Sequence, residues 1–455
     1  MTSGLINKLS SFLPEERYST HRSHLETASR DESSFPAVLP SVVVWPNSTD
    51  EISQIVKLAI EFKLPITARG SGSALEGSAI PAESGIVLDL SRMNKIKNYW
   101  PDDLQVEVEP GIIFDDLNNE IKRDGLFFPP SPGGSGHLAT IGGMVSTNAS
   151  GIFSVKYGGT KNYVLKLEIV TGAGEIIKLG SRATKRSSGY NLVDLIVGSE
   201  GTLGVISSIT LSLSGLPEHT LQNSFTFDNQ ISAAKAVSEI RKFGIDIAAI
   251  EFLDSPVIES VNKLKDYKLT VSPYLFLEFH GNNESTKSEA ESARVICLEN
   301  NGREIFLAEN QNPWEIRHFV TESIKHFSPG KKIIRNDIAF PISKLPEAVQ
   351  FCTQLSSEYK IPVFCFGHVG MGLLHALILA NPDDEREWKE GNEINSRIIR
   401  KSVELEGTVS GEHGIGLGHK SHFLIEHGKS VDYMKKIKKE FDPHNILNPG
   451  KIFDL

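Results

Sequence analysis

The hydrophobic pattern of the first half of the chain predicts short strands that alternate with amphipathic helices. Between Thr49 and Lys63, apolar residues recur at helical spacing, and Thr49 or Asp50 provides an N-cap, so we expect a helix there. Strands are predicted from β-branched or alternating runs at residues 41–45, 64–68, 86–90 and 105–109. This order is typical of an α+β or α/β protein in which strands feed glycine-rich loops.

The pattern changes near residues 215–220, where the glycine density falls and a second series of elements begins. In this series we expect strands at 224–227, 248–253, 274–280 and 363–366, and helices at 231–243, 343–359 and 384–405. The last 45 or so residues are again rich in glycine. We therefore divide the chain into a helical N-terminal segment (1–35), a first domain (36–217), a second domain (218–408) and a C-terminal segment (409–455).

Composition and charge narrow the class of protein. The 47 basic and 57 acidic residues give a net charge of −10, without a block of like charges, so we expect no nucleic-acid partner. The three cysteines, Cys297, Cys352 and Cys365, are too scattered for a disulfide framework and indicate a reducing compartment. No run approaches the roughly 18 apolar residues of a membrane span. We expect a soluble cytoplasmic protein, with peripheral contact to a membrane left open.

The first glycine-rich segment, residues 68–77, directly follows a predicted strand. Its glycines let the backbone approach an anion closely, which suits a pyrophosphate. The segment is neither a GxGxxG fingerprint, because Leu75 stands at the third glycine position, nor a P-loop. An ordinary flexible loop is the competing interpretation.

Two further segments, 129–151 and 198–206, combine glycines with small polar residues. In the first of these, small side chains leave room for a planar ring, and Ser131, Thr140, Ser146 and Asn148 offer hydrogen-bonding groups. A tight contact between helices would explain the same small residues, and 198–206 could be a simple turn.

In this order and spacing, the three segments resemble the FAD-binding domain of the vanillyl-alcohol oxidase and p-cresol methylhydroxylase superfamily. The resemblance covers residues 36–215 and implies an α+β fold, with a two-part FAD-binding domain and an α+β cap domain built on a central antiparallel sheet. It implies that 69–77 holds the FAD pyrophosphate and that the other two segments hold the flavin and adenine ends. The first loop contains neither His nor Cys, so we expect noncovalent FAD. The residues expected to bind it are Arg69, Gly70, Ser71, Gly72, Ser73, Gly77, Ser131, Pro132, Thr140, Gly142, Gly143, Asn148, Gly151, Glu200, Gly201, Gly204, Val205, Ile206 and Asn448.

Two motifs in the second half carry histidines and a carboxylate: Gly367-His-Val-Gly-Met-Gly-Leu-Leu-His375 and Ser410-Gly-Glu-His-Gly-Ile-Gly416. A bend at the glycines could bring His368 and His375 to one point. With Glu412 they would form a set of two nitrogens and one oxygen suited to zinc first, or to manganese or iron. Two buried, hydrogen-bonded histidines are the competing interpretation.

With Asn445-Ile-Leu-Asn-Pro-Gly-Lys451, these motifs are similar to the FAD-linked D-2-hydroxyacid dehydrogenases, the branch of D-lactate dehydrogenases and glycolate oxidase subunits. The resemblance implies that His368, His375 and Glu412 bind a divalent metal and that His413 is the catalytic base. It also implies substrate-binding roles for Arg317, Thr321 and Arg335, of which the two arginines would otherwise be interpreted as exposed, solvated residues. Arg317 and Thr321, four residues apart, can share one helix face.

The chain departs from the family pattern Gly-His-x-Gly-Asp-Gly-Asn-x-His at two positions, which hold Met371 and Leu373. The loss of two polar groups favours a substrate with a small or apolar tail, or a weaker metal site.

We therefore expect oxidation of a D-2-hydroxy acid, lactate-like before glycolate-like, with an unidentified electron acceptor. Three alternatives stay open at this point. The protein could be a non-redox flavin transferase of the alkyl-dihydroxyacetone-phosphate synthase type, a glycolate oxidase-type subunit of a larger oxidase complex, or a metallohydrolase without flavin. A homodimer is also compatible with the sequence.

Overall fold

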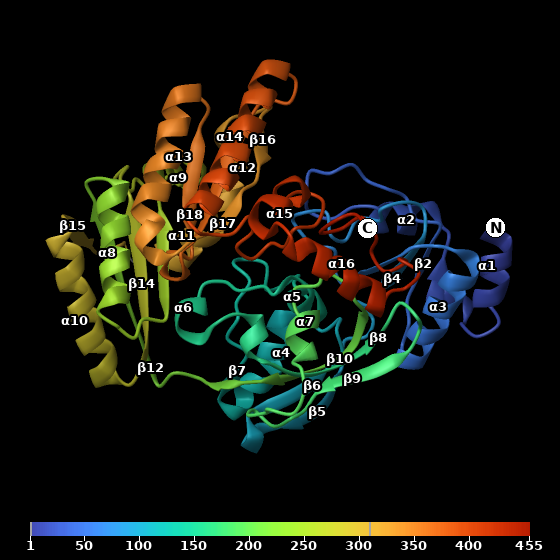
Figure 1. Ribbon diagram of the computed structural model, residues 1–455. Coiled ribbons are helices and arrows are strands. Elements are labelled where there is room, and N and C mark those ends of the chain that lie inside the picture. The colour runs from blue at the N-terminus through green and yellow to red at the C-terminus, as the bar shows by residue number, and fades with distance from the viewer. Residues whose placement is uncertain (1, 309–310) are drawn as a thin grey trace. The chain divides into compact units, whose positions relative to one another are not determined.

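The computed structural model describes residues 2–308 and 311–455, which form two compact units (Figure 1). Unit 1 comprises Met1–Ser150, Gly159–Leu216 and Glu412–Leu455. Unit 2 comprises Gly151–Gly158 and Pro217–Gly411. The C-terminal segment therefore belongs to the same unit as the N-terminal half, and a short excursion after Ser150 belongs to unit 2.

Unit 1 contains two principal sheets. The first has the order β1-β2-β4-β3, in which β2 and β3 both pair with β4 in parallel. The second is antiparallel, with the order β5-β6-β10-β8-β9, and β7 pairs separately with β11. The strands are β1 (Tyr18–Ser19), β2 (Val42–Val44), β3 (Ile66–Arg69), β4 (Ile86–Asp89), β5 (Ile96–Trp100), β6 (Gln105–Val108), β7 (Leu126–Phe127), β8 (Val164–Val170), β9 (Ile176–Gly180), β10 (Val205–Ser212) and β11 (Ser214–Gly215).

The helices of unit 1 follow the apolar periodicity of the sequence. The predicted helix is α3, whose N-cap Ser48 accepts a hydrogen bond from the backbone of Glu51 and whose apolar face lies in the core. The α-helices are α1 (Thr2–Leu9), α2 (Arg22–Ala28), α3 (Thr49–Phe62), α4 (Phe114–Ile121), α5 (Ile141–Thr147), α7 (Leu192–Ile196), α15 (Lys420–His427) and α16 (Ser430–Phe441). The 3₁₀ helices are η1 (Glu15–Arg17), η2 (Pro101–Asp103), η3 (Lys122–Asp124) and η4 (Thr160–Asn162).

Unit 2 is built on an antiparallel sheet of eight strands with the order β15-β12-β14-β13-β18-β19-β16, in which β17 also pairs with β19. This confirms the α+β class and the antiparallel sheet expected for the second domain. The strands are β12 (His219–Phe227), β13 (Ala249–Leu253), β14 (Tyr274–Gly281), β15 (Gly302–Ile305), β16 (Lys332–Ile334), β17 (Asp337–Ala339), β18 (Val363–Gly367) and β19 (Leu373–Ala380).

Each face of this sheet is covered by its own set of helices, because alternate strand residues point to opposite sides. Apolar residues of α8, α10, α13 and α14 form one core, and those of α9, α11 and α12 form the other. The helices are α6 (Ser154–Tyr157), α8 (Gln230–Lys242), α9 (Ser255–Lys265), α10 (Asn283–Glu299), α11 (Pro313–His318), α12 (Val320–Phe327), α13 (Leu345–Tyr359) and α14 (Glu385–Glu404), with 3₁₀ helices η5 (Ile342–Lys344) and η6 (Val369–Met371).

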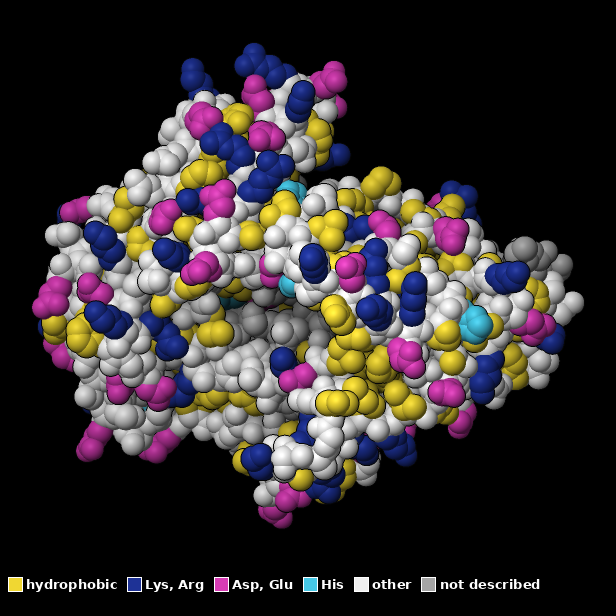
Figure 2. Space-filling model, in the orientation of Figure 1, with side chains coloured by type: hydrophobic (Ala, Val, Ile, Leu, Met, Phe, Trp, Pro, Cys, Tyr) yellow, Lys and Arg dark blue, Asp and Glu magenta, His cyan; other side chains and the backbone are white. Residues whose placement is uncertain are grey.

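Three further observations concern the cysteines, the lengths of the apolar helices and the charges on the surface. Cys297, Cys352 and Cys365 are buried free thiols. Among the described residues, no helix combines the length and the apolar character that a bilayer crossing requires. On the face drawn in Figure 2, Lys and Arg side chains are interspersed with Asp and Glu.

Candidate active site

Unit 1 contains a cavity surrounded mainly by backbone and small side chains. The segments that form its walls are the loop after β3, the start and body of α5, and the turn that leads into β10. Its lining residues are Ala68, Arg69, Gly70, Ser71, Gly72, Ser73, Ala74, Ser78, Ala79, Leu90, Pro110, Thr140, Gly142, Gly143, Ser146, Thr147, Glu200, Gly201, Gly204 and Ile206. The three glycine-rich segments of the sequence therefore meet around one space.

The close packing of this cavity explains several of its glycines. A Cβ atom at Gly70 would lie 2.2 Å from Oγ1 of Thr140, and one at Gly142 would lie 2.6 Å from Pro110. Thr140 is the N-cap of α5 and accepts a hydrogen bond from the backbone of Gly143 at 3.2 Å. At Gly201, by contrast, a Cβ atom would meet no protein atom within 4 Å. The backbone there faces open space in the cavity wall, as a ligand cradle requires.

The other residues expected to bind a cofactor lie outside the lining. Ser131 and Pro132 are half-buried, Asn148 is the exposed C-cap of α5, and Gly151 belongs to unit 2. Gly77 has a φ of +77° beside Leu417, and Val205 is the buried first residue of β10. Conversely, Ser78, Leu90 and Pro110 line the cavity without any signal in the sequence that marks them.

Asn448 connects two walls of the cavity. Its Nδ2 donates hydrogen bonds to the backbone oxygens of Ser78 at 2.9 Å and Glu200 at 2.8 Å. Its Oδ1 is buried and has no hydrogen-bond partner among the described residues. A buried amide oxygen without a donor is costly unless a ligand supplies one. Asn448 therefore fits a cavity that is completed by a cofactor.

Glu200 holds the loop that carries the Ser410–Gly416 motif. The carboxylate accepts backbone hydrogen bonds from Ile415 at 2.7 Å and from Gly416 at 2.9 Å. Gly414 has a φ of +83°, and a Cβ atom there would lie 2.9 Å from Oε1 of Glu200, so this position favours glycine. Burial raises the pKa of Glu200 to about 7, in spite of the two backbone donors.

This raised pKa predicts a pH dependence of stability. Between an ordinary value of 4.5 and about 7, the folded state holds more protons on Glu200 than the unfolded chain does. The contribution, about 3 kcal/mol, is present in full below pH 4.5 and is lost as the pH rises through 7. We expect the thermal midpoint of wild type to fall between pH 5 and 8 by more than that of Glu200→Gln, which imitates the protonated form. If scanning calorimetry shows the same fall of the thermal midpoint in both proteins, the raised pKa of Glu200 is contradicted.

Unit 2 carries a row of buried polar side chains on the face covered by α9, α11 and α12. The row crosses neighbouring strands because cross-strand partners share a face: Asp337 lies opposite His375, and Leu253 lies opposite Phe366. Its members are Glu278 and His280 on β14, Glu251 on β13, His368 after β18, His375 on β19 and Asp337 on β17. All of them are less than 8 % exposed.

Arg317 on α11 is buried against this row, so its interpretation as a solvated surface residue is wrong. It is 5 % exposed, its Nε donates to Oε2 of Glu251 at 2.6 Å, and its guanidinium lies 4.7 Å from the ring centre of Phe366. In the described part of the chain, its two Nη nitrogens make no hydrogen bond. Thr321 and Arg335 are half-buried, on α12 and between β16 and β17.

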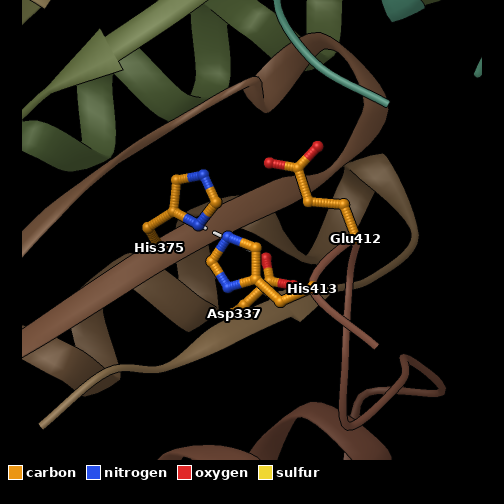
Figure 3. Close-up of side chains that lie close together, drawn as sticks. All are labelled: Asp337, His375, Glu412 and His413. Atoms are coloured by element: carbon orange, nitrogen blue, oxygen red, sulfur yellow. Dashed lines mark ion pairs between the residues drawn. The ribbon is translucent and has the colours of Figure 1, made fainter. Parts of the chain in front are cut away.

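Four side chains offer ligand atoms that lie within 4.8 Å of one another: Asp337, His375, Glu412 and His413 (Figure 3). Oδ1 of Asp337 is 3.3 Å from Nδ1 of His375. Glu412 and His413 directly follow Gly411, whose backbone N–H donates to the backbone oxygen of Asp337 at 3.1 Å. Two imidazoles and two carboxylates form a donor set that suits zinc, manganese or iron.

The group differs from the predicted metal set of His368, His375 and Glu412 in three members, because it lacks His368 and includes Asp337 and His413. His368 lies outside this group of four but next to His375, with the two ring centres 5.8 Å apart, and its Nδ1 pairs with Glu251. Asp337 is part of the group, although it lies outside both of the sequence motifs that carry the histidines and Glu412. Ser150 donates a hydrogen bond to Oε2 of Glu412 at 2.6 Å, which fixes Glu412 near the end of α5.

The two unusual residues of the histidine motif have different environments. Met371 is 49 % exposed, whereas Leu373 is 4 % exposed and occupies β19 two residues before His375. Leu373 therefore lies on the same sheet face as His375, and its side chain packs against Gly411. An apolar surface borders the cluster on this side.

Comparison with known proteins first defines the class. The chain superposes on the crystal structure of p-cresol methylhydroxylase with a TM-score of 0.83 at 16 % identity, over 99 % of this chain and 97 % of that one. This likeness confirms the two-domain FAD-binding fold of the p-cresol methylhydroxylase type.

Sequence comparison then gives the family. Residues 40–180 match the FAD binding domain, and residues 216–452 match the C-terminal domain of FAD linked oxidases. The chain is 35 % identical to a probable mitochondrial D-lactate dehydrogenase of Danio rerio, over 99 % of this chain and 92 % of that protein. It is 34 % identical to the glycolate oxidase subunit GlcD of Bacillus subtilis, over 91 % and 89 %. The chain belongs to the FAD-linked oxidase family and is an FAD-dependent oxidoreductase.

Proposed function

We propose that this protein oxidises a D-2-hydroxy acid to the 2-oxo acid, with D-lactate as the favoured substrate and glycolate second. The observation that carries the proposal is the group of Asp337, His375, Glu412 and His413, in a chain whose unit 2 also buries Arg317. A 2-hydroxy acid presents a carboxylate and a hydroxyl on adjacent carbons. A cationic fork and a cation site with a nearby base are the groups that recognise this pair.

Arg317 binds the substrate carboxylate in this proposal. Its Nε is already engaged by Glu251, so the two Nη nitrogens are the donors that a ligand can use. A guanidinium held in one orientation can bind a carboxylate through two parallel hydrogen bonds. Thr321, four residues along the chain, and Arg335, which leads into β17, are the proposed further ligands of the same carboxylate.

The hydroxyl group is handled by the histidines and carboxylates. His375 and Glu412, with His368 as the third ligand, would hold a divalent cation, most simply zinc, whose charge lowers the pKa of the hydroxyl. Asp337 orients His375 through its contact with Nδ1. His413 takes the hydroxyl proton at a ring nitrogen as general base. FAD, when bound noncovalently in the unit 1 cavity, supplies the acceptor for the hydride that leaves the α-carbon.

The size of the substrate tail follows from Leu373. Because Leu373 is buried beside His375 and offers no hydrogen-bonding group, a methyl tail fits this surface better than a charged one. This favours D-lactate over dicarboxylic hydroxy acids.

A second candidate function is that of a glycolate oxidase-type subunit in a larger complex, favoured by the identity of 34 % to GlcD. The chemistry is the same, but the natural electron acceptor would belong to a partner subunit. The FAD binding domain makes the flavin-free metallohydrolase hypothesis wrong.

The test of the proposed function is a steady-state assay of the purified chain with an artificial electron acceptor. We expect turnover with D-lactate, slower turnover with glycolate, and little with D-2-hydroxyglutarate or L-lactate. Preference for D-2-hydroxyglutarate would contradict the role of Leu373. No turnover with any 2-hydroxy acid, in protein that contains FAD and metal, would contradict the proposal.

A further inference from the structure

Glu251 is a fully buried carboxylate at the centre of the polar row in unit 2. It lies on β13 with 0 % exposure, and the chemistry proposed above gives it no role. Oε2 accepts the Nε hydrogen bond of Arg317 at 2.6 Å, and Oε1 pairs with Nδ1 of His368. One carboxylate therefore holds two cationic or polar side chains that come from α11 and from the end of β18.

The contact with His368 determines which ring nitrogen can bind a cation. A carboxylate accepts hydrogen bonds, so the proton of the imidazole must be on Nδ1 where it faces Glu251. A neutral imidazole protonated on Nδ1 has its free electron pair on Nε2. Carboxylates that hold a ligating histidine in this way fix its tautomer and its ring orientation.

The contact with Arg317 determines which part of the guanidinium can bind an anion. Because Nε is used by Glu251 and the flat face lies over Phe366, the guanidinium can rotate little. The two oxygens of Glu251 thus hold Arg317 and His368 each in one orientation.

We propose that Glu251 is a positioning residue that fixes both the carboxylate anchor Arg317 and the cation-binding nitrogen of His368. The inference rests on the proposed function, because it assumes that His368 binds a metal and that Arg317 binds the substrate. Its consequence is that one substitution, at a residue that would contact neither the substrate nor the metal, weakens the binding of both while FAD binding in unit 1 is unchanged.

The variant that tests this is Glu251→Gln. The glutamine oxygen can still accept from Arg317, but its NH₂ group then faces Nδ1 of His368 as a donor. His368 must respond by moving its proton to Nε2, which blocks that nitrogen for a metal. We expect the affinity of the metal-stripped protein for Zn²⁺, measured against a chelator, to fall about 10- to 100-fold. We also expect the KM for D-lactate to rise and the FAD content to equal that of wild type.

Glu278→Gln is the matched control. Glu278 is also buried, accepts from Nε2 of His280 at 2.6 Å, and pairs with Trp314 of α11, but His280 is not among the proposed metal ligands. We expect it to keep the Zn²⁺ affinity of wild type. Equal Zn²⁺ affinity of wild type and Glu251→Gln would overturn the inference, as would an equal loss in both variants.

Two further measurements distinguish a failure of the Glu251 inference from a failure of the proposed metal site or of folding. If wild type binds no Zn²⁺ and no other divalent metal, the metal part of the proposed function fails, whatever Glu251 does. If Glu251→Gln does not fold, the double variant Glu251→Gln with Arg317→Met removes both charges of the buried pair and avoids an unpaired cation. Wild-type Zn²⁺ affinity in that variant would also overturn the inference.

Discussion

Replacement of His413 by Gln should slow the reduction of bound FAD by D-lactate by about 10²- to 10⁴-fold, the usual contribution of a general base. The half-buried His413 lies in the cluster with His375 and Glu412, and its Nδ1 is 4.0 Å from Oε1 of Glu76. Glutamine keeps a polar side chain of similar reach but cannot take up the hydroxyl proton. The measurement is stopped-flow absorbance of the flavin under anaerobic conditions.

His419→Gln is the control for this prediction. His419 is buried beside the same carboxylate, with Nε2 3.5 Å from Oε2 of Glu76, but it is outside the cluster. It should reduce FAD at a rate close to that of wild type. Zinc content is measured in both variants, so that loss of metal is not mistaken for loss of the base. A wild-type rate in zinc-replete His413→Gln would show that His413 is not the base.

Replacement of Arg317 by Lys should lower kcat/KM for D-lactate by about 10- to 100-fold, mainly through KM. Hydrogen bonds to charged groups contribute about 1.5–3 kcal/mol each, and lysine lacks the two Nη donors that a carboxylate needs. A lysine can still provide a positive charge for the buried Glu251, so the fold of unit 2 should survive. The measurement is steady-state kinetics, accompanied by the FAD content of the variant.

The matched control for Arg317 is Arg397→Lys. Arg397 belongs to the same unit and pairs with Glu358 at 2.8 Å, but it is half-buried on α14, which packs on the face of the sheet opposite the polar row. Its kinetics should equal those of wild type. If kcat/KM for D-lactate in Arg317→Lys equals that of Arg397→Lys, Arg317 does not bind the substrate.

Periodicity and turn chemistry were sufficient to predict many elements of the fold. The predicted helices at 231–243, 343–359 and 384–405 correspond to α8, α13 and α14 within one or two residues. These segments have strongly periodic apolar faces that the sheet of unit 2 buries. The glycine-rich loops surround one cavity, as expected. Close packing explains two of their glycines, since a Cβ atom would clash at Gly70 and at Gly142.

The partners of the site residues could not be predicted from sequence. Glu251 is one carboxylate in an apolar strand, and only the pairing of β13 with β18 brings it to His368. Asp337 likewise meets His375 through strand register, over a separation that no local pattern reveals. The environments of Met371 and Leu373 differ for the same reason, since one ends a turn at the surface and the other begins a buried strand.

The most direct test of the central claim is an anaerobic titration of the purified yellow protein with D-lactate and then, in a separate sample, with L-lactate. If FAD and the cluster around His375 oxidise a D-2-hydroxy acid, D-lactate will bleach the flavin absorbance stoichiometrically with formation of pyruvate, and L-lactate will leave it unchanged. A flavin that stays oxidised with D-lactate in the metal-replete protein, or that L-lactate bleaches equally well, would contradict the account.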